Sequence, residues 1–377
     1  MRVHRANLDL LRATAITVVF IHHVGQYLEG IPEIAHQIMA FGGFGVDLFF
    51  VLSGWLIGGI FFREYGQKGS VNLTSFWARR WFRTMPPYYA ALILSWAAVF
   101  VARREPFDLR FLFFLQNYSD LVPYFKISWS LCIVEHFYLF LPLFLLLFLR
   151  VKLVPYACVA LILLSFGLRV YHTGPEYPKF GYLITATHFR LDGLVSGVLC
   201  AYVYYLKPAS WKTFSSWLMG IGLIGGCVSL TLYALDSTYL YSFGILALSA
   251  CFAGLLCLCV NKSDWAFART RAVYAIAISS YSIYLVHALL INVCYQYMKD
   301  RGVWFTLASI GLTVIFTYIF HASVEEVSKK LRDRFFPSPA PVPAPELPAG
   351  MIAPAATQVE EVSPVIVREN GGITPGG

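Results

Sequence analysis

The chain contains ten blocks of predominantly apolar residues, each long enough to cross a lipid bilayer as a helix. Long apolar runs without strict alternation or a heptad repeat favour a bundle of transmembrane helices. The composition agrees, because 58% of the 377 residues are hydrophobic and 13% are charged, whereas soluble domains carry about 25% charged residues. We therefore expect an all-α integral membrane protein of about ten spans: 8–28, 45–62, 85–102, 127–149, 152–171, 187–206, 213–235, 239–260, 273–297 and 302–323.

The distribution of lysine and arginine predicts the orientation of these spans. Placing the N-terminus inside gives the inner segments most of the basic residues, including Arg2, Arg5, Lys329 and Lys330. Arg169 is counted with the outer loops in this scheme. Because cytoplasmic loops are enriched in lysine and arginine, both termini are expected in the cytoplasm, which requires an even number of spans.

The chain divides into two parts by composition. Residues 1–336 hold all the predicted spans and form the membrane domain, within which the stretch 107–116 is too short to cross. Residues 337–377 are rich in proline and alanine and show no apolar periodicity. Such a segment buries too little surface to fold alone, so a disordered cytoplasmic tail is expected.

Several classes of partner and site find no support in the sequence. The eight cysteines form no CxxC pair, and no HExxH motif, Walker loop or glycine-rich dinucleotide loop is present. We therefore predict no metal site and no tightly bound cofactor. The net charge of +8 is poor evidence for a nucleic-acid partner, because the basic residues flank the spans instead of interleaving with aromatic residues.

The first span carries ionisable residues that are costly in a membrane. Arg12 and His23 are 11 positions apart, which is three helical turns plus about 20°, so both lie on one stripe about 16 Å apart along the axis. His22 points about 80° away from Arg12 and is the weaker candidate, while Asp9 can pair with Arg12 across three positions. Ionisable groups inside a membrane usually mark a functional path, although this pair could instead join helices.

Asp47 enters the second span near the face toward which His23 points. Its carboxylate could hold a histidine tautomer or accept a substrate hydroxyl, or it could cap the helix. Small residues around it would allow close helix packing: Gly42, Gly43, Gly45, Gly54, Gly58 and Gly59.

A cluster of arginines precedes the third span. Arg79, Arg80 and Arg83 lie in FWARRWFRTMPPYY, and Arg80 and Arg83 share one face if the segment is helical. Guanidinium groups suit phosphate oxygens, so the cluster is a candidate anion site. The same arginines could simply reflect the cytoplasmic enrichment of positive charge, but the two prolines at 86 and 87 predict a turn beside them.

The fourth span begins WSLCIVEHFYLF and places Glu135 and His136 about two turns inside, flanked by Trp129 and Tyr138. A carboxylate at that depth indicates a functional group more often than decoration. The sixth predicted span opens with further polar residues: His188, Arg190 and Asp192.

The last two spans carry weaker signals. Ser280, Tyr284 and His287 fall on one helical face, where they could contact substrate or make an interhelical hydrogen bond. His321 and Glu325 are four positions apart near the last cytoplasmic end, where we expect the helix to terminate.

Together these motifs resemble the membrane acyltransferase-3 family over roughly residues 6–325. The segments that carry the resemblance occur in order: LDLLRATAITVVFIHH, GVDLFFVLSGWLI, FWARRWFRTMPPYY, WSLCIVEHFYLFLPL and SYSIYLVHALL. The family's R-x10-H motif falls on Arg12 and His23, its R-x-x-R motif on Arg80 and Arg83, and its W-S-L-x-x-E segment on Trp129 and Glu135.

The resemblance implies transfer of an acyl group, usually acetyl from acetyl-CoA, to a hydroxyl of a carbohydrate or lipid-linked glycan. The implied location is a plasma membrane, such as the bacterial inner membrane. Candidate residues divide into three groups: catalytic His23, Arg12, Glu135 and Asp47; acyl-CoA-binding Arg80, Arg83 and Arg79; substrate-binding Trp129, Tyr138, Tyr284 and His287. His23 could act as general base or carry the acyl group itself.

The main alternative is a proton-coupled carrier of a glycan or small metabolite, with Arg12, His23, Asp47 and Glu135 as the proton relay. A third interpretation is a scaffold in which these polar groups only stabilise the bundle. The arginines at 80 and 83 favour the transferase, because a proton-coupled carrier does not need a cytoplasmic anion site.

Overall fold

A computed structural model describes residues 5–119, 122, 124–150, 152–173 and 180–337, and within them the secondary structure is helical, without a strand. The longer helices are α1 Ala6–Gly25, α2 Glu33–Phe41, α3 Gly45–Lys68, α4 Leu73–Arg103, α5 Trp129–Arg150, α6 Val154–His172, α8 Leu191–Leu206, α9 Pro208–Ala234, α10 Phe243–Asn261, α11 Arg271–Tyr297, α12 Val303–Phe320 and α13 Glu326–Phe335. The shorter elements are α7 Phe180–Thr185, the π-helical η8 His321–Glu325, and the 3-10 helices η1 Gly42–Phe44, η2 Leu109–Phe113, η3 Gln116–Tyr118, η4 Lys126–Ser128, η5 Thr187–Phe189, η6 Thr238–Tyr241 and η7 Ala266–Arg269.

Nine helical segments of the described chain are long and apolar enough to cross a membrane. They match nine of the ten predicted spans, and the tenth is α8, an apolar helix of 16 residues. The prediction of an all-α, multi-pass membrane protein is therefore confirmed. The stretch 107–116 forms no crossing helix, since it contains only the short element η2. Residues 338–377 of the predicted tail lie outside the described residues.

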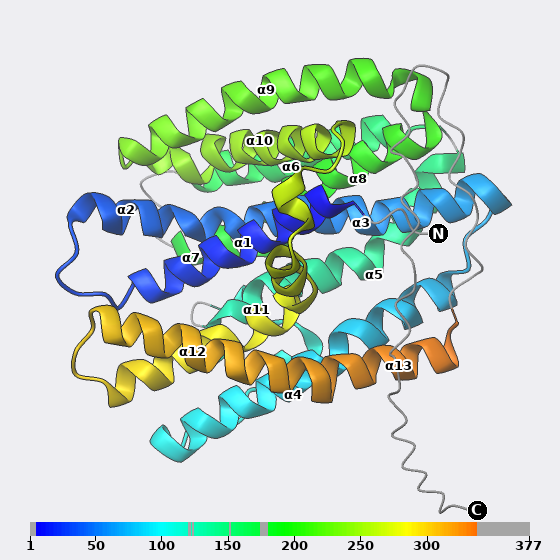
Figure 1. Cartoon of the computed structure of the whole chain (residues 1–377). Coiled ribbons are helices and arrows are strands. Elements are labelled where there is room, and N and C mark those ends of the chain that lie inside the picture. The colour runs from blue at the N-terminus through cyan, green and yellow to red at the C-terminus, as the bar shows by residue number, and fades with distance from the viewer. Residues whose placement is uncertain (1–4, 120–121, 123, 151, 174–179, 338–377) are drawn as a thin grey trace, which may run out of the picture. The chain divides into compact units, whose positions relative to one another are not determined.

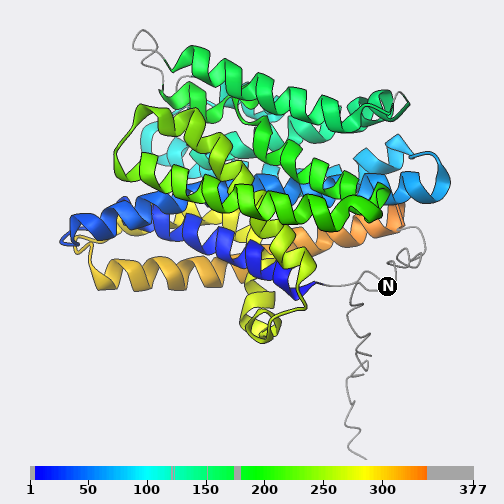
Figure 2. The same ribbon diagram turned by 90° about the horizontal axis from the view of Figure 1, so that it is seen from above.

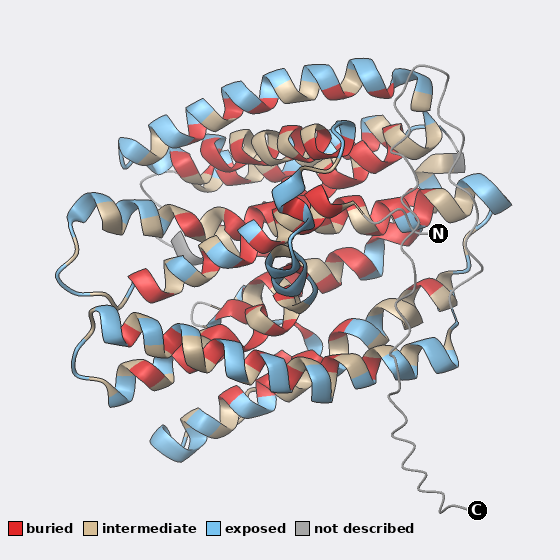
Figure 3. Ribbon diagram, viewed as in Figure 1, coloured by how far each residue is buried: buried red, intermediate tan, exposed pale blue. Residues whose placement is uncertain are grey.

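Successive helices run back and forth along a common direction, so segments distant in sequence become neighbours (Figures 1 and 2). Helix α1 packs against α3 and α11, and α3 packs against α8. Buried residues concentrate on these central helices, whereas α9 is exposed along most of its length (Figure 3). An apolar exposed surface suits contact with lipid, because hydrocarbon penalises charged groups and not apolar ones.

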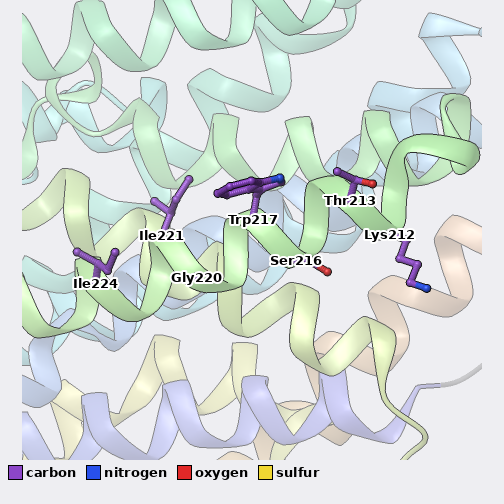
Figure 4. A pocket seen from close by; sticks show the side chains of 7 residues that line it. All are labelled: Lys212, Thr213, Ser216, Trp217, Gly220, Ile221 and Ile224. Carbon is purple, nitrogen blue, oxygen red and sulfur yellow. The ribbon is translucent and has the colours of Figure 1, made fainter.

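The shallow groove shown in Figure 4 belongs to this exposed helix. Every residue that lines it comes from α9: Lys212, Thr213, Ser216, Trp217, Gly220, Ile221 and Ile224. The lining contains one titratable side chain, that of Lys212, and no acid–base pair. The groove is therefore a poor candidate for a reaction site.

Glycines allow α3 and α8 to approach backbone to backbone. A methyl group on Gly54 would lie 1.8 Å from the carbonyl oxygen of Leu194, and one on Gly197 would lie 2.1 Å from that of Val51. Neither position has room for a side chain, which is the usual role of small residues between membrane helices. The close approach that we predicted for the glycines of 42–59 is thus confirmed at Gly54, and it holds the first half of α8 against the middle of α3.

The prolines at 86 and 87 do not form the predicted turn. Both lie inside α4, which begins at Leu73 and therefore includes the arginine cluster. Pro86 has no N–H group, so the carbonyl of Phe82 loses its usual helical donor. The hydroxyl of Ser328 on α13 donates to that carbonyl instead. Membrane helices tolerate proline where neighbouring helices satisfy the freed backbone groups in this way.

The helix expected to terminate near His321 continues. Residues His321–Glu325 form a π-helical turn that joins α12 to α13 without a break. The sequence interpretation of this pair as a helix terminus was wrong, because the side chains of both residues face other helices and hold the segment within the bundle. Glu325 accepts a hydrogen bond from Ser282 of α11 at 2.5 Å.

Candidate active site

The side chain of His23 meets that of His287, which lies 264 positions later in the chain. Nδ1 of His23 is 3.3 Å from Nε2 of His287, and the two rings meet edge to face with centroids 4.8 Å apart. Packing of α11 against α1 brings the two histidines together. His287 is fully buried, whereas His23 is half-buried.

Hydrogen bonds to carbonyl groups determine which nitrogen of each neutral ring carries the proton. Nδ1 of His287 lies 2.8 Å from the carbonyl oxygen of Tyr284, and Nδ1 of His23 lies 2.8 Å from that of Val19. A carbonyl oxygen only accepts, so both Nδ1 atoms carry hydrogen. Nε2 of His23 then carries a lone pair and has no hydrogen-bond partner among the described residues. A general base or a nucleophile requires such an available lone pair.

His22 contacts other residues than His23 does. Its Nε2 lies 2.9 Å from Nε2 of Gln26, and its ring packs beside Gly43 of η1. These contacts are consistent with its direction on the helix, about 80° away from Arg12. The structure therefore separates the two adjacent histidines, with His23 facing α11 and His22 facing η1.

Three arginines come together at the other end of α1. Arg12 of α1 lies within electrostatic range of Arg80, and Arg83 lies within electrostatic range of both. Asp9 offsets part of this charge through an ion pair with Arg12 at 2.7 Å. Because like charges repel, a cluster of three guanidinium groups is favourable mainly when an anion is bound among them.

The arginines differ in their remaining contacts. Arg80 donates to the hydroxyl of Tyr138 and lies over its ring at 4.1 Å, and Arg83 is exposed. Arg79 donates instead to the carbonyl oxygen of Phe336 at 3.3 Å, at the end of α13. Of the three predicted donor-binding arginines, Arg80 and Arg83 thus lie in the same charged cluster as Arg12, whereas Arg79 joins two helices.

Glu135 is buried beside the arginines. Its charged neighbour is Arg80, and the hydroxyl of Thr84 lies next to its carboxylate. Oε2 of Glu135 has no hydrogen-bond partner in the described part of the chain. A buried carboxylate oxygen without a partner is expensive, which is evidence for a group that contacts substrate.

His136 does not share this environment. Its Nδ1 lies 2.8 Å from the hydroxyl of Thr187, and its ring lines an apolar cavity of about 470 Å³ between α5, α6 and α8. Glu135 and His136 are consecutive, so they project about 100° apart on α5. Glu135 is therefore the one that lies with the arginines.

We expect Glu135→Gln to lower acyl transfer about tenfold to a hundredfold while leaving the yield of folded protein unchanged. Glutamine keeps the size of the side chain, so packing survives, and a charged hydrogen bond contributes about 1.5–3 kcal/mol. The measurement is transfer per molecule of protein recovered in detergent. Poor recovery with normal activity per molecule would instead place Glu135 in a structural role.

Asp47 pairs with Arg190 and not with a histidine. Oδ1 of Asp47 lies 2.6 Å from Nη2 of Arg190, and both side chains are buried. The guanidinium of Arg190 also lies over the rings of Phe50 and Trp129, at 5.8 and 5.7 Å from their centroids. Trp129 is thus near Arg190, just before α8, whereas Tyr138 contacts Arg80. These two predicted substrate residues therefore contact different arginines.

Tyr284 links two helices. Its hydroxyl lies 2.5 Å from the hydroxyl of Ser130 and donates to the carbonyl oxygen of Ile127 at 3.0 Å. The ring of Tyr284 is also 5.7 Å from that of His287. These contacts fix the part of α11 that carries His287 against the start of α5, which is the interhelical alternative that the sequence left open.

A second buried ion pair was missed from the sequence. Arg169 of α6 makes a two-point contact with Asp192 of α8, at 3.1 and 2.5 Å, and both side chains are fully buried. The assignment of Arg169 to an outer loop was wrong, because the residue lies inside α6. A signal was present in the spacing: an arginine next to the end of one apolar block and a carboxylate at the start of the next are candidates for such a pair.

The described residues contain no group of three or more histidine, cysteine, aspartate or glutamate side chains placed to hold a metal ion. Their cysteines are all free thiols and lie in helices.

Comparison with known proteins identifies the family. A family model described as Acyltransferase domain matches residues 5–322. The chain belongs to this acyltransferase-3 family. The match includes both histidines, the arginine cluster, Glu135 and the two buried ion pairs, and it confirms the resemblance of the motifs.

The names of individual relatives agree with an acyltransferase family. Putative O-acetyltransferase SACOL0978 of Staphylococcus aureus strain COL is 28% identical over 358 residues, covering 86% of this chain and 57% of that protein. O-acetyltransferase OatA of Staphylococcus aureus strain NCTC 8325 is 27% identical over 357 residues with the same coverage. This chain therefore spans little more than half the length of these relatives. No solved structure matches the chain significantly.

Proposed function

We propose that this acyltransferase-family protein transfers an acyl group, acetyl from acetyl-CoA, to a hydroxyl of a carbohydrate or lipid-linked glycan. The observation that carries the proposal is the division of α1 between two sites. Arg12 lies with Arg80 and Arg83, and His23 presents a free Nε2 three turns away. The separation along the helix is about 16 Å.

An acyl-CoA molecule matches this arrangement. Its phosphates are anionic and suit guanidinium groups, and its thioester lies at the far end of a flexible arm. Binding the phosphates at the arginines would therefore leave the arm to reach along α1 toward His23. A carrier for a neutral glycan has no comparable need for three convergent arginines.

His23 would receive one proton and release it again during acyl transfer. Nε2 takes the proton of the acceptor hydroxyl while the oxygen attacks the thioester carbonyl. Collapse of the tetrahedral intermediate breaks the carbon–sulfur bond, and the departing thiolate of CoA receives the proton from the imidazolium. Alternatively, Nε2 attacks the carbonyl itself and the acyl group passes to the hydroxyl in a second step. Acid quenching of enzyme with labelled acetyl-CoA, before acceptor is added, would distinguish an acyl-histidine route from the direct one.

The proposed location is a plasma membrane, such as the bacterial inner membrane, with the arginine site open to the cytoplasm. The acceptor would be modified at or across the bilayer. Mass spectrometry of surface glycans from cells with and without the protein would test the assignment. Loss of one acetyl increment from a glycan is the expected result, and identical glycan masses would contradict it.

Substitution of the arginines tests the donor site. We expect Arg80→Ala or Arg83→Ala to raise the acetyl-CoA concentration needed for half-maximal transfer about tenfold or more, because each charged contact contributes about 1.5–3 kcal/mol. The acceptor concentration dependence should change little. Arg79→Ala is the matched control, since Arg79 contacts the end of α13. An unchanged donor dependence for both Arg80→Ala and Arg83→Ala would reduce the cluster to a determinant of membrane orientation.

A further inference from the structure

The backbone on both sides of Arg83 is held by two different helices. Ser328 of α13 donates to the carbonyl of Phe82, and the hydroxyl of Tyr281 on α11 donates to that of Thr84 at 2.8 Å. Pro86 and Pro87 leave the carbonyls of Phe82 and Arg83 without helical donors, so the first bond occupies one of these freed carbonyls and the second lies one residue beyond them. The position of Arg83 therefore depends on α11 and α13 as well as on its own helix.

Glu325 lies between these two holding points. It is fully buried and accepts a hydrogen bond from Ser282, the residue after Tyr281, at 2.5 Å. Nδ1 of His321 lies 3.0 Å from Oε2 of Glu325, and Nζ of Lys329 lies 2.9 Å from its Oε1. The Ser282 hydroxyl and the Lys329 ammonium both favour the ionised carboxylate, the first as a hydrogen-bond donor and the second as a countercharge.

Glu325 and Arg83 carry opposite charges and lie on elements that pack together. Opposite charges attract, and the attraction is stronger away from bulk water. The π-helical turn packs against α4, which places Glu325 on the side of the bundle that carries the arginines. π-helical turns are uncommon, and they occur frequently at functional sites.

We propose that Glu325 is a positioning residue for Arg83, which orients the guanidinium toward the anionic part of the acyl donor. The inference rests on the proposed function, because it assigns Arg83 to donor binding. Glu325 would act through Arg83 and through the held backbone of 82–84, without touching the donor. Arg12 has an equivalent carboxylate partner in Asp9, so each end of the arginine site has its own acidic residue.

The direction of the effect on donor affinity distinguishes positioning from simple charge. Removing a negative charge near an anion site should strengthen anion binding by electrostatics alone. Loss of positioning should weaken it, because a misdirected guanidinium loses its contact with phosphate. We therefore expect Glu325→Gln to weaken CoA binding about tenfold, the size of one charged contact, and to raise the KM for acetyl-CoA with little change in kcat or in the acceptor KM.

The experiment is calorimetric titration of the purified, full-length protein with CoA, together with transfer kinetics. Glu326→Gln is the matched control, because it removes the same charge one position later from a more exposed side chain that shares the partners Lys329 and His321 with Glu325. It should bind CoA as the unmodified protein does. If Glu325→Gln is poorly recovered, Ser282→Ala removes one donor to the carboxylate and keeps the charge, and a smaller loss of CoA affinity is expected.

A double variant gives the decisive result. If Glu325 acts through Arg83, Glu325→Gln should have no further effect on CoA affinity in an Arg83→Gln background, because coupled residues are not additive. Additive effects, unchanged CoA affinity in Glu325→Gln and Ser282→Ala, or tighter binding would each overturn the inference. Absence of CoA binding by the unmodified protein would instead contradict the proposed donor, so the two failures are distinguishable.

Discussion

His23→Ala is expected to abolish acyl transfer, with a rate loss of about 10²–10⁴-fold, the usual contribution of a positioned general base. The imidazole supplies the free Nε2, and its orientation is set by the contacts of Nδ1 with Val19 and His287. Alanine removes the base, and the neighbouring imidazole of His22 packs beside η1, where it does not replace the lost one. The measurement is transfer per molecule in membranes with matched protein levels.

His22→Ala is the control for this prediction. It removes an imidazole of the same size from the adjacent position, but that ring contacts Gln26 and η1 instead of His287. We expect a loss of a few fold at most, arising from looser packing between α1 and η1. An inactive His22→Ala beside an active His23→Ala would show that the wrong histidine has been assigned.

Asp47→Asn should lower the free energy of unfolding by about 3–5 kcal/mol, the usual cost of breaking a buried ion pair from one side. The variant leaves the buried guanidinium of Arg190 without its countercharge. Thermal unfolding in detergent, compared with the recovery of folded protein, measures this loss. Transfer per folded molecule tests the other predicted role of Asp47, in the reaction itself, because a purely structural carboxylate would leave it unchanged.

Glu64→Gln provides the comparison on the same helix. Glu64 pairs with Lys68 at 3.3 Å, and the lysine side chain is half exposed. Surface pairs of this kind contribute about 0–1 kcal/mol, so little change in unfolding is expected. In addition, replacing both partners of the buried pair, as Asp47→Leu with Arg190→Met, should recover much of the lost stability, because no uncompensated charge is left inside. Equal losses for Asp47→Asn and Glu64→Gln would show that burial of the Asp47 pair contributes nothing.

Buried polar contacts divide the central helices into regions with different tasks. Asp47–Arg190 and Arg169–Asp192 both end at the start of α8, where close glycine packing holds that helix against α3. His23 and the arginine cluster lie on α1 and α4, and their contacts include His287 of α11, Asp9 of α1 and Tyr138 of α5. Variants of the first group should therefore change stability most, and variants of the second should change transfer.

Local features of the sequence predicted the class of protein and the candidate residues of α1. Apolar blocks of sufficient length predict membrane helices because hydrocarbon leaves the backbone few other ways to satisfy its hydrogen bonds. The shared stripe of Arg12 and His23 follows from helical periodicity alone, and so does the shared face of Arg80 and Arg83. These inferences depend on neighbours within a few turns, which the sequence states directly.

Only the tertiary structure decided which of these groups meet. Packing of α11 on α1 places His287 beside His23. Packing of α8 on α3 places Arg190 beside Asp47, so Asp47 pairs with this arginine and not with a histidine. Two local interpretations failed for the same reason. Ser328 satisfies the carbonyl freed by Pro86, and Ser282 holds Glu325, so neither the turn nor the helix end forms. Partners from distant helices can outweigh local propensity, because a buried polar group without a partner costs more than a locally unfavourable conformation.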